Sequence, residues 1–143
     1  MTTENTITAL SPARLATLPR EALVRLALKL DAVVTGANGV AYLVLAGVLD
    51  EPFGMPAGFL RGVGAFLTLF ALAVWLVASR PSVRPAAVTA VIAANLVWVV
   101  ESLALVAFDW FSPSTAGAVW VVLQAIVVAG FAGLQLCAVR RRA

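Results

Sequence analysis

Residues 86–108 read AAVTAVIAANLVWVVESLALVAF, a run of 23 positions with a single charge at Glu101. Residues 32–49, 57–77 and 116–139 form three further stretches of the same apolar character. Each is close to the roughly 20 residues that a helix needs to cross about 30 Å of hydrocarbon. Nearly every charge of the chain lies between or outside these stretches. The pattern predicts a membrane protein with four spanning helices.

Composition agrees with this interpretation. Of the 143 residues, 62% are hydrophobic and 12% are charged, and the mean hydropathy is +1.01, far from the balance of soluble domains. Lipid offers no hydrogen-bond partner to the backbone, so a spanning segment is either a helix or a strand of a closed barrel. The apolar runs do not alternate with polar residues as barrel strands do. We therefore expect an all-α fold, with every proline before or between the helices, where it interrupts none of them.

The basic residues are distributed unevenly about the predicted helices. Only Arg61 lies on the side of Asp50, Glu51 and Asp109. The other nine lie before the first helix, between the second and third, and at the C-terminus: Arg14, Arg20, Arg25, Lys29, Arg80, Arg84, Arg140, Arg141 and Arg142. Short loops rich in Lys and Arg stay in the cytoplasm. Both termini are therefore expected to be cytoplasmic, and the net charge of +3 reflects topology and anionic lipid; no nucleic-acid partner is expected.

The predicted organisation is a cytoplasmic segment, residues 1–20, followed by one transmembrane domain, residues 21–143. Its helices are expected at about residues 21–49, 57–79, 85–109 and 115–139, as an up-down four-helix bundle. Residues 1–10 have neither the basic start nor the cleavage pattern of a signal peptide, so the first helix is expected to direct its own insertion. Two interpretations of residues 20–29 remain open: an amphipathic extension in the headgroup region, or the polar start of a long helix.

The two halves of the chain show a weak similarity. Asp50 stands eight residues before Gly58, and Asp109 stands eight residues before Gly117; each glycine follows an alanine. Duplicated helical hairpins would give this pattern as a parallel internal repeat. Chance similarity between two apolar hairpins is the alternative.

Polar side chains within the apolar stretches are costly in lipid, and normally face a bundle interior or a cavity. In the first predicted helix, Asp31, Thr35, Asn38 and Tyr42 are spaced by four, three and four residues, which places them on one face. Each of the other three helices carries a similar polar face. The candidate intramembrane site drawn from all four helices is Asp31, Asn38, Tyr42, Arg61, Asn95, Trp98, Glu101 and Gln124.

Four of these residues are expected at one depth. With about 1.5 Å of rise per residue, Tyr42, Arg61, Glu101 and Gln124 lie roughly 7 to 14 Å from the outer boundary. We expect Glu101 to contact Arg61, directly or through Tyr42 or Gln124, because a buried charge without a partner costs several kcal/mol. The pair either locks the bundle or forms part of a ligand or proton site.

The remaining candidates have more ordinary expected roles. Asp31 lies near the cytoplasmic end, where we expect it to snorkel and to pair with Lys29, Arg80, Arg84 or Gln135. Asn38 and Asn95 lie near mid-membrane, where amides usually join helices. Trp98 would border a cavity if one exists. Six glycines are expected to allow close helix approach: Gly36, Gly39, Gly58, Gly62, Gly130 and Gly133.

Missing residue types exclude several kinds of site. The chain has no histidine, which excludes imidazole ligation of haem and most zinc or copper sites. Its single cysteine, Cys137, excludes an internal disulfide or a C-x-x-C centre. There is no phosphate-binding glycine loop or Ser/His/Asp set. We predict no cofactor and no metal, and an enzymatic function is not our expectation.

Three functions from different classes fit these observations. The preferred one is a structural or accessory membrane component, alone, as a homo-oligomer or within a larger membrane complex. The second is a small oligomeric transporter or channel that uses Glu101; small multidrug transporters are similar in size, but their glutamate is on the first helix. The third is a lipid or quinone binder. A sealed bundle favours the first, a hydrated cavity the second, and an apolar groove open to lipid the third.

Across its whole length the chain resembles small four-helix integral membrane proteins of unknown function from high-GC bacteria such as actinobacteria. The segments that carry the resemblance are LDAVVTGANG, residues 30–39, and NLVW, residues 95–98. Nine arginines against one lysine fit such a genome. The resemblance implies four helices and a location in the bacterial cell membrane, and it assigns no activity or site.

Overall fold

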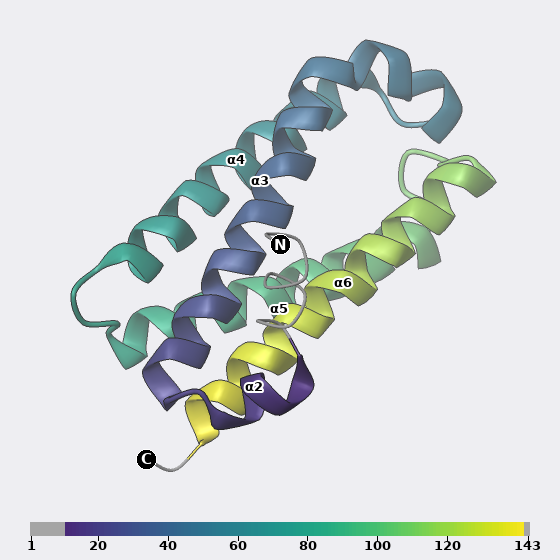
Figure 1. The fold of residues 1–143 in the computed structure, drawn as a ribbon. Coiled ribbons are helices and arrows are strands. Elements are labelled where there is room, and N and C mark those ends of the chain that lie inside the picture. The colour runs from purple at the N-terminus through teal and green to yellow at the C-terminus, as the bar shows by residue number, and fades with distance from the viewer. Residues whose placement is uncertain (1–10, 142–143) are drawn as a thin grey trace, which may run out of the picture.

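The computed structural model describes residues 11–141, and this part of the chain is helical without any strand. Its elements are α2 (Pro12–Thr17), α3 (Arg20–Phe53), α4 (Ala57–Ser79), α5 (Pro85–Ala107) and α6 (Thr115–Arg140) (Figure 1). The last four are long and apolar enough to cross a membrane, so the expectation of an all-α chain with four such helices is confirmed. Arg142 and residues 1–10, on which part of the sequence argument rests, lie outside the described residues.

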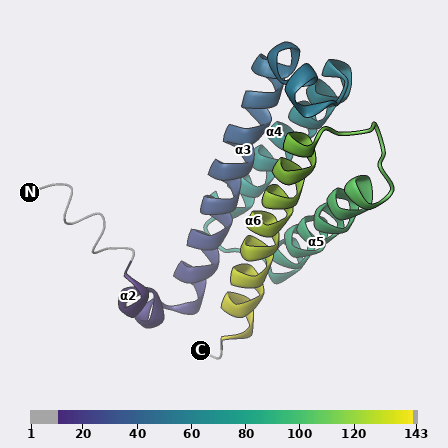
Figure 2. The ribbon, with the colours of Figure 1, turned by 90° about the vertical axis from the view of Figure 1, so that its right-hand side faces the viewer.

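The long helices form two hairpins that meet along α3 and α6. α3 packs along α4, α5 packs along α6, and α3 contacts α6, whereas α4 and α5 barely touch. One end of the molecule, here called the basic end, holds α2, the connection 80–84 and the last turn of α6 (Figure 2). The opposite end, here called the acidic end, holds residues 50–57 and 108–114. In Figure 2 the connection 108–114 reaches across the acidic end from α5 to α6.

The first long helix is longer than the sequence predicted. α3 continues through Pro52 to Phe53, so Pro52 lies inside the helix and not in a connection. Gly54 ends it with a φ of 66°, and a Cβ there would lie 2.6 Å from the backbone nitrogen of Ser114. Only glycine fits such a position. The N–H of Ser114 donates to the carbonyl of Phe53 at 2.9 Å, which attaches the start of α6 to the end of α3.

Residues 20–29 are the first part of α3 rather than a separate element. Leu23, Val24 and Leu28 are buried in an apolar cluster with Val74 of α4 and Val88 of α5. This face packs on protein, which favours the interpretation as the start of a long helix. The cluster fills the space between the helices at the basic end.

Two arginines tie the elements of the basic end together. The guanidinium of Arg25 donates to the carbonyls of Ala78 and Arg80 at the C-terminus of α4, and pairs with Glu21 at 2.9 Å. Arg141 donates to the carbonyl of Ala16 at 3.2 Å and to those of Leu15 and Leu18, in and just after α2. Both satisfy carbonyls that a helix end leaves unpaired.

Close approach between helices depends on fewer glycines than expected. A Cβ on Gly39 would lie 2.9 Å from the carbonyl oxygen of Gly64, and one on Gly64 would lie 2.7 Å from that of Gly39, so α3 and α4 touch backbone to backbone here. Gly36 is also close to α4. The prediction is wrong for four positions that have nothing within 4 Å of a built Cβ: Gly58, Gly62, Gly130 and Gly133.

The two glycines that suggested duplication have different surroundings. Gly117 lies directly against the backbone of Phe53, whereas Gly58 faces open space. The internal repeat remains a prediction.

Candidate functional site

A buried polar network joins three helices nearer the basic end. Asp31 of α3 is 0% exposed, as is Gln135 of α6, and Asn95 of α5 is 3% exposed. The amides of Asn95 and Gln135 each donate to Oδ2 of Asp31 at 2.7 Å, and the hydroxyl of Thr35 donates to Oδ1 at 3.0 Å. Asn95 also donates to Gln135 at 3.3 Å. The carboxyl group is therefore the common acceptor for three helices, an arrangement we call the Asp31 network.

This arrangement corrects the expectation for Asp31. The predicted contact with Gln135 is present, but Asp31 does not snorkel and is paired with no base. Lys29 lies over the ring of Trp75, 5.4 Å from its centroid. Within residues 11–141 the only ion pair joins Arg25 and Glu21. Neutral donors take the place of the expected cation. Because both carboxylate oxygens accept hydrogen bonds from them, the carboxyl group can be fully buried.

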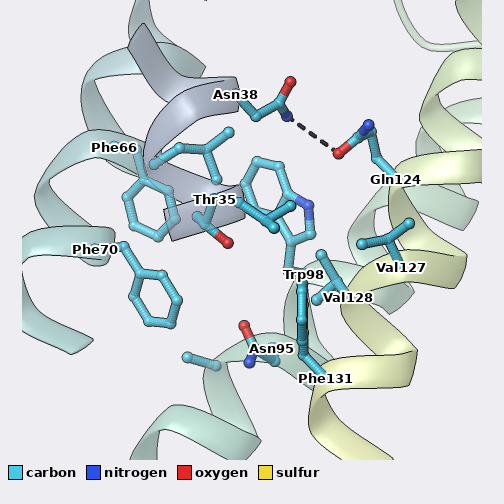
Figure 3. A pocket seen from close by; sticks show the side chains of 13 residues that line it. Thr35, Asn38, Phe66, Phe70, Asn95, Trp98, Gln124, Val127, Val128 and Phe131 are labelled. Carbon is cyan, nitrogen blue, oxygen red and sulfur yellow. Dashed lines mark hydrogen bonds between the residues drawn. The ribbon is translucent and has the colours of Figure 1, made fainter. Parts of the chain in front are cut away.

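A second polar contact lies about two to three turns further towards the acidic end. The amide of Asn38 donates to Oε1 of Gln124 at 3.2 Å, which joins α3 to α6. Figure 3 shows this bond on one side of a small cavity, with Asn95 on the other and Trp98 between them. The cavity measures about 30 Å³, enough for one or two water molecules. Asn38 and Asn95 thus join helices as predicted.

A much larger groove occupies the half of the molecule nearer the acidic end. Its volume is about 530 Å³. α4 forms one side, with Phe59, Gly62 and Phe66, and α5 forms the other, with Trp98 and Glu101. Tyr42 of α3 and Gln124 of α6 belong to the same lining. The backbones of α4 and α5 approach each other closely at few positions, which leaves room for the groove. Its lining residues Gly62, Phe66 and Glu101 are exposed on the surface of the helices.

Tyr42 and Gln124 place polar groups in the groove lining. The indole N–H of Trp120 donates to the hydroxyl oxygen of Tyr42 at 2.7 Å, and Asn38 is a further hydrogen-bond partner of this hydroxyl. Asn38 occupies the carbonyl oxygen of Gln124, and no described group accepts from the amide nitrogen of Gln124. This amide lies among mainly apolar lining residues, where an acceptor on a bound molecule would be favoured.

The predicted contact between Glu101 and Arg61 is wrong. Neither an ion pair nor a hydrogen bond joins them, directly or through Tyr42 or Gln124. Arg61 belongs to the other face of α4, where its guanidinium lies 3.8 Å from the position of a Cβ on Gly47 of α3. Three of the four residues predicted at one depth therefore line one groove, and Arg61 does not. Residue counting predicts how deep a residue lies along a helix, but it does not predict how the helix is rotated about its axis.

Stacked aromatic rings form part of the groove lining. Phe59 and Phe111 stack with ring centroids 4.3 Å apart, and Phe66 stacks on Trp98 at 5.8 Å. Phe111 has a φ of 63°, in the left-handed region that bulky residues rarely adopt. The connection 108–114 thus holds a phenylalanine over the groove in an unfavourable backbone conformation. These phenylalanines were not among the candidate site residues, because no spacing rule connects them.

A third cavity, of about 940 Å³, lies at the basic end beneath α2. Its lining includes Arg20, Glu21 and Arg141. Arg141 is already bonded to α2 and Glu21 to Arg25, so two of these three charged groups have partners within the protein.

The residues of the groove and network place limits on the possible chemistry. No group of three His, Cys, Asp or Glu side chains in the described part of the chain is arranged to hold a metal ion. What the site offers is hydrogen bonding, one exposed carboxylate and aromatic surface. Comparison of the chain with known protein families, with curated proteins and with solved structures gives no match.

Proposed function

We propose that this chain is a multi-pass protein of a bacterial cell membrane that binds an amphipathic molecule in the groove between α4 and α5. Its four long helices would cross as an up-down bundle, with the basic end and both termini in the cytoplasm. The groove then lies in the outer half of the membrane. This is the lipid or quinone binder among the three functions that fit the sequence.

The observation that carries the proposal is the groove of about 530 Å³. Ligand sites in proteins commonly measure about 300 to 1,000 Å³ and combine apolar walls with a few placed polar groups. Here the walls are aromatic and aliphatic, and Tyr42 and Gln124 supply the polar groups. A quinone carbonyl or a lipid ester would accept from the amide of Gln124, while an apolar tail leaves between α4 and α5.

The packing at the basic end favours binding over transport. Beyond the Asp31 network the interior is filled by an apolar cluster that includes Leu28, Val74 and Val88. Within residues 11–141, no residue of this cluster lines the groove. A purely structural or accessory role, which the sequence alone favoured, requires no groove. A binding function therefore accounts for more of the geometry.

A glycine at the groove edge allows a direct test. Gly62 lines the groove and a Cβ there meets nothing within 4 Å, so Gly62→Leu should fold and fill the opening. Gly58, one turn away, is equally open but does not line the groove. The proteins are reconstituted in vesicles of phosphatidylethanolamine, phosphatidylglycerol and a long-chain quinone, and then released for native mass spectrometry.

We expect one bound lipid or quinone on the wild type and on Gly58→Leu, and none on Gly62→Leu. Equal adducts on all three proteins, or none on any of them, would refute the proposed function.

A further inference from the structure

We propose that the groove selects amphipathic cations, with Glu101 as the countercharge and the aromatic rings as the remaining walls of the headgroup site. This inference rests on the proposed binding function and adds the charge of the ligand to it. Its evidence is the charge of the lining, the aromatic content of the lining and the charges at the acidic end.

Among residues 11–141, Glu101 is the only charged residue that lines the groove. It is exposed, and it forms no ion pair with any of these residues. Arg61, the base that the sequence predicted as its partner, lies instead near Gly47 of α3. A carboxylate at the edge of an apolar groove within a membrane is costly without a partner, and a ligand with a positive charge would supply that partner.

The other walls suit the same kind of headgroup. Six aromatic residues line the groove: Tyr42, Phe59, Phe66, Trp98, Trp110 and Phe111. The face of an aromatic ring attracts a cation within about 6 Å of its centroid, and aromatic cages are a recurring solution for binding quaternary ammonium groups. Two of these rings, Phe59 and Phe111, stack at 4.3 Å over the outer part of the groove. A soft organic cation gains from the rings and the carboxylate together.

Charges outside the groove also favour a cationic ligand. Asp50, Glu51 and Asp109 lie at the acidic end, against the single base Arg61. Such an excess of one sign raises the local concentration of cations and lowers that of anions. A phosphate headgroup would instead stand next to Glu101 with no base among the lining residues. An anionic phospholipid is therefore the poorest of the amphipathic ligands for this groove.

A pair of probes with nearly the same shape and opposite charge tests the inference. Tetraphenylphosphonium is a cation and tetraphenylborate an anion, and each presents four phenyl rings. Binding is measured by equilibrium dialysis on the full chain in uncharged maltoside micelles, with protein-free micelles as the blank. The variants are Glu101→Gln, Gly62→Leu and Asp109→Asn. Asp109 is the matched control, because it is an acidic-end carboxylate outside the lining and its φ of 52° suits asparagine.

We expect saturable binding of tetraphenylphosphonium and none of tetraphenylborate. Glu101→Gln should weaken the binding of tetraphenylphosphonium by about tenfold or more, since a charge-assisted contact is lost. Asp109→Asn should change this binding by less than about twofold. Gly62→Leu should abolish it.

The failures separate the two proposals. If both probes bind alike and Gly62→Leu abolishes both, the groove is a binding site without charge selection, and only this inference is overturned. If Asp109→Asn weakens the phosphonium as much as Glu101→Gln does, diffuse surface charge explains the effect and the inference is again overturned. If neither probe binds saturably, both the inference and the groove as a binding site fail.

Discussion

The two halves of this molecule use polar residues in opposite ways. Nearer the basic end, Asp31, Asn95 and Gln135 satisfy one another at 2.7 to 3.3 Å and are 0 to 3% exposed, so that three helices are held together. Nearer the acidic end, Glu101 is exposed beside a groove of about 530 Å³ and pairs with no residue in the part of the chain that the structure describes. Polar groups that find partners join helices, and polar groups that do not are available to a ligand.

The contrast between the two halves requires that the Asp31 network stabilises the fold. Asp31→Ala leaves the amides of Asn95 and Gln135 and the hydroxyl of Thr35 without their acceptor. Interhelical bonds in membranes contribute about 0.6 to 2 kcal/mol each, so we expect a loss of about 2 to 4 kcal/mol in the free energy of unfolding. Denaturation with sodium dodecyl sulfate in mixed micelles measures it.

Asp50→Ala is the control, because Asp50 bonds to the neighbouring backbone N–H of Glu51. We expect it to change the unfolding free energy by less than about 0.5 kcal/mol. A loss for Asp31→Ala no larger than this would contradict the account of the network.

The contact between α3 and α4 gives the next largest effect. In Gly39→Ala the new Cβ would lie 2.7 Å from the hydroxyl of Thr68 and 2.9 Å from the carbonyl of Gly64. Overpacking of this kind costs about 1 to 3 kcal/mol. Gly130→Ala is the matched control, since nothing lies within 4 Å, and alanine favours the helix by about 0.5 to 1 kcal/mol. Thermal unfolding in micelles should place the two variants on opposite sides of the wild type, and the same midpoint for both would argue against the close approach.

Tyr42 belongs to both halves of the comparison, because it accepts from Trp120 and lines the groove. Tyr42→Phe leaves the indole N–H of Trp120 without an acceptor, at an expected cost of about 1 kcal/mol. The double variant Tyr42→Phe/Trp120→Phe should cost less than the sum of the single changes, because the bond is lost only once. Strict additivity in chemical denaturation would show that the bond contributes nothing.

The smallest effect sharpens the contrast at the acidic end. Glu101→Gln and Arg61→Gln should each change the unfolding free energy by less than about 0.5 kcal/mol, because the two side chains are unpaired with each other. Their coupling in a double-mutant cycle should be close to zero. A coupling of about 1 kcal/mol or more would restore the ion pair that the sequence predicted.

Residue counting predicted the helices well because four apolar runs of suitable length have no other structure in lipid. It also predicted that Tyr42, Glu101 and Gln124 share a depth, and they line one groove. It could not predict that Arg61 turns away, because the rotation of α4 against its neighbours depends on how Gly39 and Gly64 pack.

The Asp31 network was beyond the sequence for a similar reason. Counting placed Asp31 beside Lys29 and near the basic end, where snorkelling is the ordinary outcome. Its partners Asn95 and Gln135 lie 64 and 104 residues away, and nothing in their spacing states that they meet. Three helices must be packed before a neutral set of donors replaces the expected cation.

The most direct test of the central claim asks whether lipid chains enter the groove. A variant with Trp98 as its only tryptophan, made by changing Trp75, Trp110 and Trp120 to phenylalanine, is reconstituted in phospholipids brominated on their acyl chains. A second variant keeps only Trp75, which is 42% exposed on α4 and outside the groove. Bromine quenches the fluorescence of a tryptophan that it contacts.

The account predicts quenching of Trp98 comparable to that of Trp75, although Trp98 is partly buried. Adding Gly62→Leu should protect Trp98 from quenching and leave the quenching of Trp75 unchanged, because Gly62 lines the groove together with Trp98, whereas Trp75 lies outside it. A Trp98 that is not quenched, or whose quenching is unaffected by Gly62→Leu, would contradict the claim that the outer half of the molecule opens to lipid between α4 and α5.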